Sequence, residues 1–197
     1  MSQRFFTSDL HIRHDLVVGE RGFSGDSMHE DYELFLAAKW DSRVRAGDQV
    51  FILGDLAMNP NKGAFEWLAA RPGRKVLISG NHDATHPLHS TWMTATRNWL
   101  ASGIFENIAS QGSVKINGQK VLMSHFPYNG EGQRDMADRH TEWRFRNEGL
   151  PLLHGHTHSS EDPADGNQLH VGLDAWNLEL VHELSVQDWL DGIETSF

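Results

Sequence analysis

The sequence predicts an α/β sandwich whose strands are mixed in direction, and three observations support this fold class. Short apolar runs alternate along the chain with segments of helical periodicity, which is typical of α/β folds. Each run leads directly into a polar or glycine-containing cluster, as buried strands do where they end in functional loops. An Asn-Gly pair between two alternating segments predicts a hairpin, so not all strands are parallel. A chain of 197 residues can bury a hydrophobic core without disulfides or a structural metal. We therefore expect residues 1–197 to form one domain.

Five apolar runs are the candidate strands that lead into polar clusters. They are residues 4–8, 49–53, 75–79, 120–123 and 150–153. The predicted hairpin joins residues 113–116 to residues 119–122 through Asn117 and Gly118, which suit a two-residue type I′ turn. Two further candidate strands lie near the end of the chain. They are residues 168–173 and 178–184.

Four segments have helical patterns. They are residues 30–44, 65–70, 90–101 and 186–193. Asp26 or Ser27 is a suitable N-cap for the first segment, and Ser185 is a suitable N-cap for the last. The tryptophans within these patterns are expected in the core, and they are Trp40, Trp67 and Trp99.

The composition excludes several kinds of site and partner. With 17 basic and 27 acidic side chains the net charge is −10, so long duplex nucleic acid is not an expected partner. The absence of cysteine excludes disulfides, thiolate zinc sites, iron–sulfur clusters and cysteine nucleophiles, so any metal must be held by nitrogen and oxygen. Asp9 precedes any apolar stretch of signal-peptide length, and no stretch is long enough to span a membrane. We therefore expect a cytoplasmic protein without a membrane partner.

Side chains that bind metals follow the predicted strands. They are Asp9, His11, Asp55, Asn81, His82, His125, His156 and His158. Each alone has an ordinary explanation, such as a turn cap for an aspartate and a surface or core position for a histidine. Independent capping would not place all of them at the ends of five strands, so the set predicts one shared site.

These motifs, in this order, resemble those of the calcineurin-like metallophosphoesterase superfamily. The blocks are Asp9-Leu10-His11, Gly54-Asp55, Gly80-Asn81-His82-Asp83, His125 and Gly155-His156-Thr157-His158. The block at residues 171–177 is similar to that of small stand-alone bacterial and phage members. The Gly54-Asp55 block lacks the second acidic residue of some members, which leaves the subfamily open but removes no ligand. The resemblance implies an α/β sandwich of two mixed β-sheets flanked by helices.

The resemblance also implies two metal ions. One would be held by Asp9, His11, Asp55 and His158, and the other by Asp55, Asn81, His125 and His156. Asp55 would then bridge the two ions. Imidazole and carboxylate ligands without thiolate suit Mn²⁺, iron or Zn²⁺ rather than Ca²⁺, and Mn²⁺ is the ion we expect first.

The implied reaction follows from charge. Two such ions with two aspartates and a bridging hydroxide would leave a centre of about +1, which attracts a phosphoester. We therefore predict hydrolysis of a phosphomonoester or phosphodiester by the metal-bridging hydroxide, without a protein nucleophile. His82 is expected to protonate the leaving alkoxide or to hold a phosphoryl oxygen, and Asp83 to fix its tautomer. The alternative for His82 is a structural role beside the ligands.

The expected substrate is a phosphorylated small molecule or a nucleotide. The candidates for contacting it are Arg13, His14, Arg21 and Asn81, although an ordinary solvated loop explains the first three equally well. Residues 127–149 contain arginines and aromatic residues that suit a cap over the site, but the acidic residues among them favour a solvated helix or loop. The remaining histidines are expected to be structural or on the surface, with His170 and Asp174 near the cleft.

Two other functions stay open. A nuclease or a cyclic-nucleotide phosphodiesterase would use the same chemistry, and a protein-interaction scaffold would keep the fold without it. A scaffold has no physical reason to keep histidines around carboxylates, which favours an enzyme. The sequence leaves open the natural substrate, the preference for monoesters or diesters, the native metals and the oligomeric state.

Overall fold

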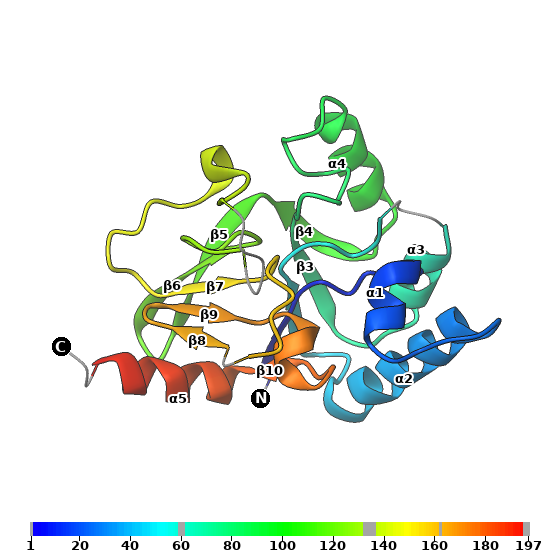
Figure 1. Cartoon of the computed structure of the whole chain (residues 1–197), viewed down its shortest axis with the longest axis horizontal. Coiled ribbons are helices and arrows are strands. Elements are labelled where there is room, and N and C mark those ends of the chain that lie inside the picture. Colours follow the sequence, from blue (N-terminus) through cyan, green and yellow to red (C-terminus); the bar gives the residue numbers. More distant parts are fainter. Residues whose placement is uncertain (1, 59–61, 132–136, 162, 195–197) are drawn as a thin grey trace.

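Two five-stranded sheets pack face to face in the computed structural model, which describes residues 2–58, 62–131, 137–161 and 163–194 (Figure 1). The first sheet has the order β10-β1-β2-β3-β4, with β10 antiparallel to β1 and the other neighbours parallel. Its strands are β1 (Arg4–Thr7), β2 (Gln49–Ile52), β3 (Arg74–Ile78), β4 (Phe105–Ala109) and β10 (Val181–His182).

The second sheet has the order β5-β6-β7-β9-β8, in which the three central strands are parallel and both edge strands are antiparallel to their neighbours. Its strands are β5 (Gln111–Ile116), β6 (Gln119–Ser124), β7 (Leu152–His154), β8 (Ala164–Asp165) and β9 (Gln168–His170). Both sheets are therefore mixed, and the predicted α/β sandwich is confirmed.

Five helices and two short 3₁₀ turns complete the described fold. They are α1 (Asp15–Glu20), α2 (Met28–Arg43), α3 (Lys62–Ala69), α4 (Trp92–Ala101), α5 (Glu183–Glu194), η1 (Thr141–Trp143) and η2 (Leu173–Trp176). In Figure 1, α1 to α4 lie on one side of the first sheet, and α5 runs along the bottom of the view, beneath β8 and next to β10. None of the described helices is both long and apolar enough to span a membrane.

The strands β1, β2 and β3 of the first sheet bury both of their faces, which explains why they are continuous apolar runs. Phe5 packs with the helices on the outer face, whereas the next residue, Phe6, packs in the layer between the sheets. The outer layer includes Trp40, Trp67 and Trp99, so the prediction that these tryptophans lie in the core is confirmed.

The ends of the two sheets are joined where the predicted site lies. Ser8, just after β1, forms a parallel bridge with Gly172, just after β9. Gly155, just after β7, lies so close that an added Cβ atom would stand 1.9 Å from Ser8 Oγ. Only glycine allows this approach, and it places the loops after β1 and β7 against each other.

Several boundaries near the end of the chain differ from the prediction. The strand expected at residues 168–173 ends at His170, because Gly172 pairs with the first sheet and η2 follows. The strand expected at residues 178–184 has only two residues, and α5 begins at Glu183. Ser185 therefore lies inside α5 and does not cap it.

Three elements were not predicted from the sequence, namely α1, β4 and β8. The strand β4 is an edge strand with exposed Glu106 and Asn107, so it lacks the apolar run that marks its neighbours. Within residues 127–149, the described part contains η1 and otherwise irregular backbone, while residues 132–136 lie outside the described residues.

The predicted hairpin is confirmed. Ile116 pairs with Gln119 across a two-residue turn, and Asn117 and Gly118 have φ angles of 48° and 85°, as a type I′ turn requires.

Replacing Gly118 by Ala should lower the free energy of unfolding by about 1 kcal/mol, because open space surrounds the position but its positive φ disfavours a side chain. Gly192→Ala, within α5 and also in open space, is the matched control and should stabilise the protein by about 0.5–1 kcal/mol. Urea unfolding measures both variants. Equal effects of the two substitutions would contradict the turn assignment.

Candidate metal centre

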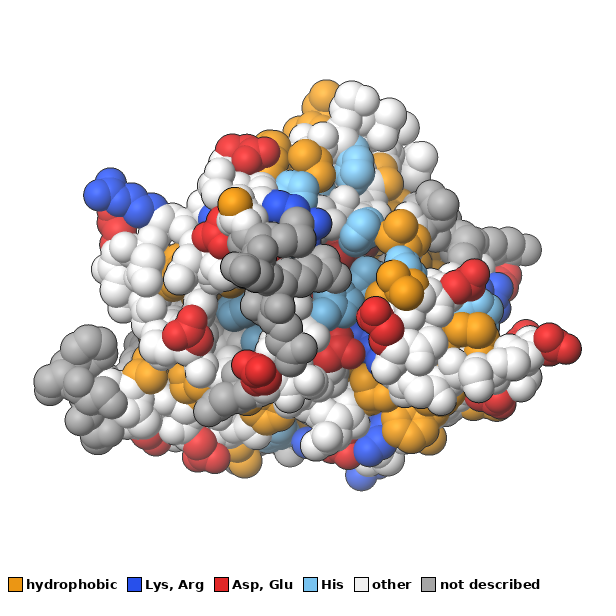
Figure 2. Space-filling model, viewed as in Figure 1, with side chains coloured by type: hydrophobic (Ala, Val, Ile, Leu, Met, Phe, Trp, Pro, Cys, Tyr) orange, Lys and Arg blue, Asp and Glu red, His pale blue; other side chains and the backbone are white. Residues whose placement is uncertain are grey.

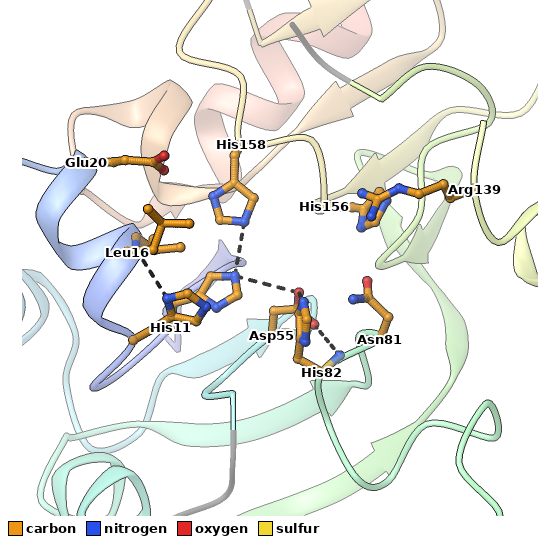
Figure 3. A pocket seen from close by; sticks show the side chains of 11 residues that line it. His11, Leu16, Glu20, Asp55, Asn81, His82, Arg139, His156 and His158 are labelled. Carbon is orange, nitrogen blue, oxygen red and sulfur yellow. Dashed lines mark hydrogen bonds and ion pairs between the residues drawn. The ribbon is translucent and has the colours of Figure 1, made fainter. Parts of the chain in front are cut away.

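Buried carboxylates and histidines converge where the two sheets join (Figure 3). His125 Nε2 lies 3.4 Å from Asp55 Oδ2, and His158 Nε2 lies 3.6 Å from Asp9 Oδ1. His11 Nε2 lies 3.7 Å from Asp55 Oδ2 and 3.0 Å from His158 Nε2. Figure 2 shows histidine side chains gathered in a hollow near the middle of this face. The loops after β1, β2, β6 and β7 thus supply ligand atoms to one place.

Two groups of ligand atoms, each within 4.8 Å of one another, are suited to hold a metal ion. They are Asp9, His11 and His158, and Asp9, Asp55 and His125. The first group consists of three of the ligands expected for one ion. The second contains two of the ligands expected for the other ion, Asp55 and His125, together with Asp9, so Asp9 is the residue common to both groups, whereas Asp55 was expected to bridge them. Asn81 Oδ1 lies 3.1 Å from His125 Nε2, and both Asn81 and His156 line the adjoining cleft. The structure therefore brings all seven expected ligands together.

The backbone at these ligands is held in an uncommon conformation. The φ angles of five ligands are positive, namely 58° at Asp9, 45° at His11, 55° at Asp55, 73° at His156 and 51° at His158. Such a conformation costs on the order of 1 kcal/mol or more at each residue without a compensating contact. Hydrogen bonds between loops compensate here, because the amides of Asp9 and His11 donate to the carbonyls of Gly54 and Asp55 at 3.0 Å.

The ligand imidazoles are oriented through the nitrogen that faces away from the site. His125 Nδ1 lies 2.7 Å from the carbonyl of Leu53, and His158 Nδ1 lies 3.0 Å from Asp174 Oδ2. An acceptor at Nδ1 fixes the proton there and leaves Nε2 for a metal, which is how proteins set the tautomer of a ligand histidine.

Arg21 is a structural residue and does not face the cleft, contrary to its suggested role in substrate binding. Its buried guanidinium forms a bidentate pair with Asp174 at 2.8 Å and donates to the carbonyl of Asp9 at 2.8 Å. Burial would raise the pKa of Asp174, but hydrogen bonds from Arg21 and His158 hold it well below its usual range. Arg21 therefore fixes both the Asp9 loop and the partner of His158.

Glu131 is a site residue that sequence reasoning missed. Its buried carboxylate oxygen Oε2 lies 3.2 Å from His156 Nε2, which leaves Nδ1 of that histidine for a metal. Arg139 and Arg144 pair with the same carboxylate. In the sequence, Glu131 is one of several acidic residues in a stretch of mixed charge. Nothing in the sequence shows which of these acidic side chains is buried.

The charge states fit a cation. Burial would raise the pKa of Asp9 and of Asp55, but the surrounding histidines hold both pKa values below their usual range. Burial lowers the pKa of His11 and of His156 to about 3, so both are neutral donors at neutral pH. Charged carboxylates with imidazole nitrogens, without thiolate, form a donor set that suits Mn²⁺, iron or Zn²⁺.

His82 lines the cleft beside the ligands. Its ring is partly exposed, with Nε2 3.9 Å from Asp55 Oδ2, while its backbone amide donates to Asp55 Oδ1 at 3.0 Å. Burial lowers the pKa of His82. The ring is thus accessible from the cleft, and its expected role toward a leaving group stays a prediction.

Asp83 has a different partner from the one expected. Its fully buried carboxylate accepts hydrogen bonds from the amides of Asp55 at 2.9 Å, Leu56 at 3.0 Å and Gly80 at 2.7 Å, and not from the His82 ring. Burial and the neighbouring Asp55 raise the pKa of Asp83 to about 7. Asp83 therefore fastens the loop after β2 to the loop after β3.

Of the candidates for substrate contact in the first loop, His14 lines the cleft and Arg13 does not. His14 Nδ1 also accepts from the Val17 amide at the start of α1. Arg13 Nε instead pairs with Glu33 of α2 at 2.7 Å. The expected position of Asp174 and His170 near the site is also found, with His170 Nε2 3.9 Å from Asp9 Oδ2.

Asp83→Asn should lower the free energy of unfolding by about 2 kcal/mol, because an amide offers one acceptor oxygen where two receive three backbone N–H groups. Urea unfolding measures the change, and Asp26→Asn on the exposed surface is the matched control. An Asp83→Asn protein as stable as the control would contradict the fastening role.

Metal binding at pH 7 should release at least one proton, mainly from His125. Burial would lower the pKa of His125, but the attraction of Asp55 outweighs it and raises that pKa to about 9. The metal must displace this proton, so affinity should rise about tenfold per pH unit until pH approaches that pKa. Calorimetry in buffers of different ionisation enthalpy counts the protons, and His125→Ala should release about one fewer. Binding without proton release would contradict this role.

The chain matches the family model of the calcineurin-like phosphoesterase superfamily domain over residues 6–173. The gene 66 protein of Mycobacterium phage D29 is 41% identical over 203 residues, covering 98% of both chains. The gene 66 protein of Mycobacterium phage L5 is 38% identical over 207 residues, covering 98% of this chain and 96% of that protein.

Among solved structures, the protein of unknown function AQ665 from Aquifex aeolicus has a similar fold. Its TM-score is 0.71 at 18% identity, with 96% of this chain and 100% of that chain covered. The match to the family model spans every ligand of the candidate metal centre, and the phage relatives align along nearly their whole length. This family indicates hydrolysis of phosphoric esters. The two phage relatives are covered along nearly their whole length, and the chain thus belongs to the calcineurin-like phosphoesterase superfamily.

Proposed function

We propose that the chain is a dinuclear, metal-dependent phosphoesterase that hydrolyses monoesters or diesters of phosphorylated small molecules or nucleotides. Mn²⁺ is the preferred ion in this proposal, with iron or Zn²⁺ as alternatives. The observation that carries it is the convergence of seven ligand side chains from five strand ends on two adjoining groups that can each hold an ion.

Charge and orientation support a cation site at the floor of the cleft. Asp9 and Asp55 are fully buried yet keep low pKa values, and such anions are stable in a protein only when paired with positive charge. When bound, two divalent ions would supply that charge, activate water and neutralise the phosphoryl oxygens. The outward nitrogens of His125, His156 and His158 are each held by an acceptor, so the rings need not reorganise to bind.

Two of the chain's own groups stand where a leaving group would lie. The Asn81 amide and the His82 ring line the cleft next to Asp55, and the exposed edge of His82 can donate a hydrogen bond or a proton to the leaving oxygen. The held Asp83 loop fixes the backbone of both residues and thus their distance from the metal ligands.

Asp55→Ala tests the dinuclear centre. We expect it to reduce metal content from two ions per chain to one or none, and to lower hydrolysis of bis(4-nitrophenyl) phosphate in Mn²⁺ by at least about a hundredfold. Asp26→Ala on the exposed surface is the control and should change neither. Two bound ions and normal turnover in Asp55→Ala would contradict the proposal.

Two comparisons extend the test. His82→Ala should lower turnover by roughly a hundredfold while both ions stay bound, whereas loss of the ions would contradict its role toward the leaving group. A strong preference of the wild type for the diester over 4-nitrophenyl phosphate would favour the nuclease or cyclic-nucleotide alternative. Bound ions without hydrolysis of either ester would favour a scaffold.

A further inference from the structure

The cleft above the candidate metal centre has a floor of ligands and two chemically different walls. One wall is α1, which contributes Leu16, Val17 and Glu20. The other wall carries Arg139, which lies beside His156 and opposite Glu20 in Figure 3. Figure 2 shows hydrophobic and acidic side chains at the border of the histidine-rich hollow, in the region of α1.

Arg139 is the only lysine or arginine among the described residues that line this cleft. The other arginines near the site have buried or distant partners. Arg21 and Arg144 have side chains only 3% exposed, and Arg13 pairs with Glu33 away from the cleft. The side chain of Arg139 is 40% exposed. Among the described residues, Arg139 is therefore the positively charged side chain placed to contact a molecule bound in the cleft.

Glu131 holds Arg139 in place. One carboxylate oxygen of Glu131 lies 2.9 Å from both Nε and Nη2 of Arg139, and the other accepts from the Arg139 backbone amide at 2.7 Å. Arg144 pairs with the same carboxylate from the buried side, so one buried anion is shared by two cations. The guanidinium is thus oriented before any ligand binds, which reduces the entropy lost on binding.

Glu131 and Asp138 balance the formal charge of Arg139 and Arg144, but neither acidic residue lines the cleft. Glu131 has a side chain only 1% exposed, and Asp138 pairs with Arg144 and does not line the cleft. Only the arginine of this cluster is presented at the cleft wall. Glu20, on the opposite wall, would repel an anion and so direct it toward Arg139.

The two positive regions serve different parts of a substrate. Metal ions at the floor would face the phosphoryl group that reacts, whereas Arg139 stands at the partly exposed wall, where the rest of the substrate lies. A guanidinium binds phosphate oxygens with strong, directional hydrogen bonds. Resting on the proposed function, we propose that Arg139 selects phosphoesters that carry a second phosphate group beyond the scissile one.

A matched pair of chromogenic esters tests this selection. The 4-nitrophenyl ester of thymidine 5′-phosphate is compared with the same ester carrying a 3′-phosphate, both in Mn²⁺. We expect the wild type to prefer the 3′-phosphorylated ester by about tenfold in kcat/KM, mainly through KM, and Arg139→Gln to lose that preference. Arg146→Gln, on the same segment but 88% exposed, is the control and should keep it.

Several outcomes would overturn the proposal. A wild type without preference, or an Arg139→Gln variant that keeps the preference, would each contradict it. Equal loss on both esters would show that Arg139 acts through Glu131 on His156 and not on the substrate. Loss of the preference in Arg146→Gln as well would indicate a general charge effect.

A binding measurement separates this proposal from the proposed function. Calorimetry with thymidine 3′,5′-bisphosphate and thymidine 5′-monophosphate should show the same tenfold difference in the wild type and its loss in Arg139→Gln. If neither nitrophenyl ester nor bis(4-nitrophenyl) phosphate is hydrolysed, the proposed function fails. The binding difference then still decides whether Arg139 recognises the second phosphate, and equal binding of both nucleotides would overturn that role.

Discussion

Three backbone amides share the buried carboxylate of Asp83, and the geometry of the site depends on this contact. Through the amides of Asp55, Leu56 and Gly80 it fastens the loop after β2 to the loop after β3. The loop after β2 in turn accepts hydrogen bonds from the amides of the Asp9 loop. Because these hydrogen bonds form a continuous chain, residues with positive φ are held in place and their side chains project into a common space.

Charged side chains are buried at this same edge of the sheets, which is rare in folded proteins. Two aspartates are buried side by side, and three of the imidazoles around them are fixed from behind: His125 by a carbonyl, His158 by Asp174 and His156 by Glu131. Both the strained backbone and the buried anions cost stability, and bound cations would offset that cost. The residues at this edge therefore favour the binding of cations, at a cost to the stability of the sandwich without them.

The floor and the walls of the cleft come from different kinds of structure. The floor consists of loops that directly follow core strands, so its positions are fixed by the packing of two sheets. The walls consist of the short helix α1 and of irregular chain around Glu131 and Arg139, which the sheets do not constrain. Chemistry at the floor can thus be common to a family, while recognition at the walls can change by substitution of few residues.

The sequence by itself determined the α/β class, the buried strands, the Asn117-Gly118 hairpin and the expected ligands, because periodicity, turn chemistry and ordered motifs are local properties of the chain. It did not determine that Asp83 holds backbone amides, that Arg21 is buried against Asp174, or that Glu131 stands behind His156. Apart from Gly80, which is close to Asp83 in sequence, these partners are distant: Asp55 is 28 residues from Asp83, Asp174 is 153 from Arg21, and Glu131 is 25 from His156. It also missed β4 and the start of α5, since an exposed edge strand and a helix directly after a strand lack the expected patterns. Tertiary structure alone decided these points, because burial and pairing between distant segments set the charge, orientation and exposure of a side chain.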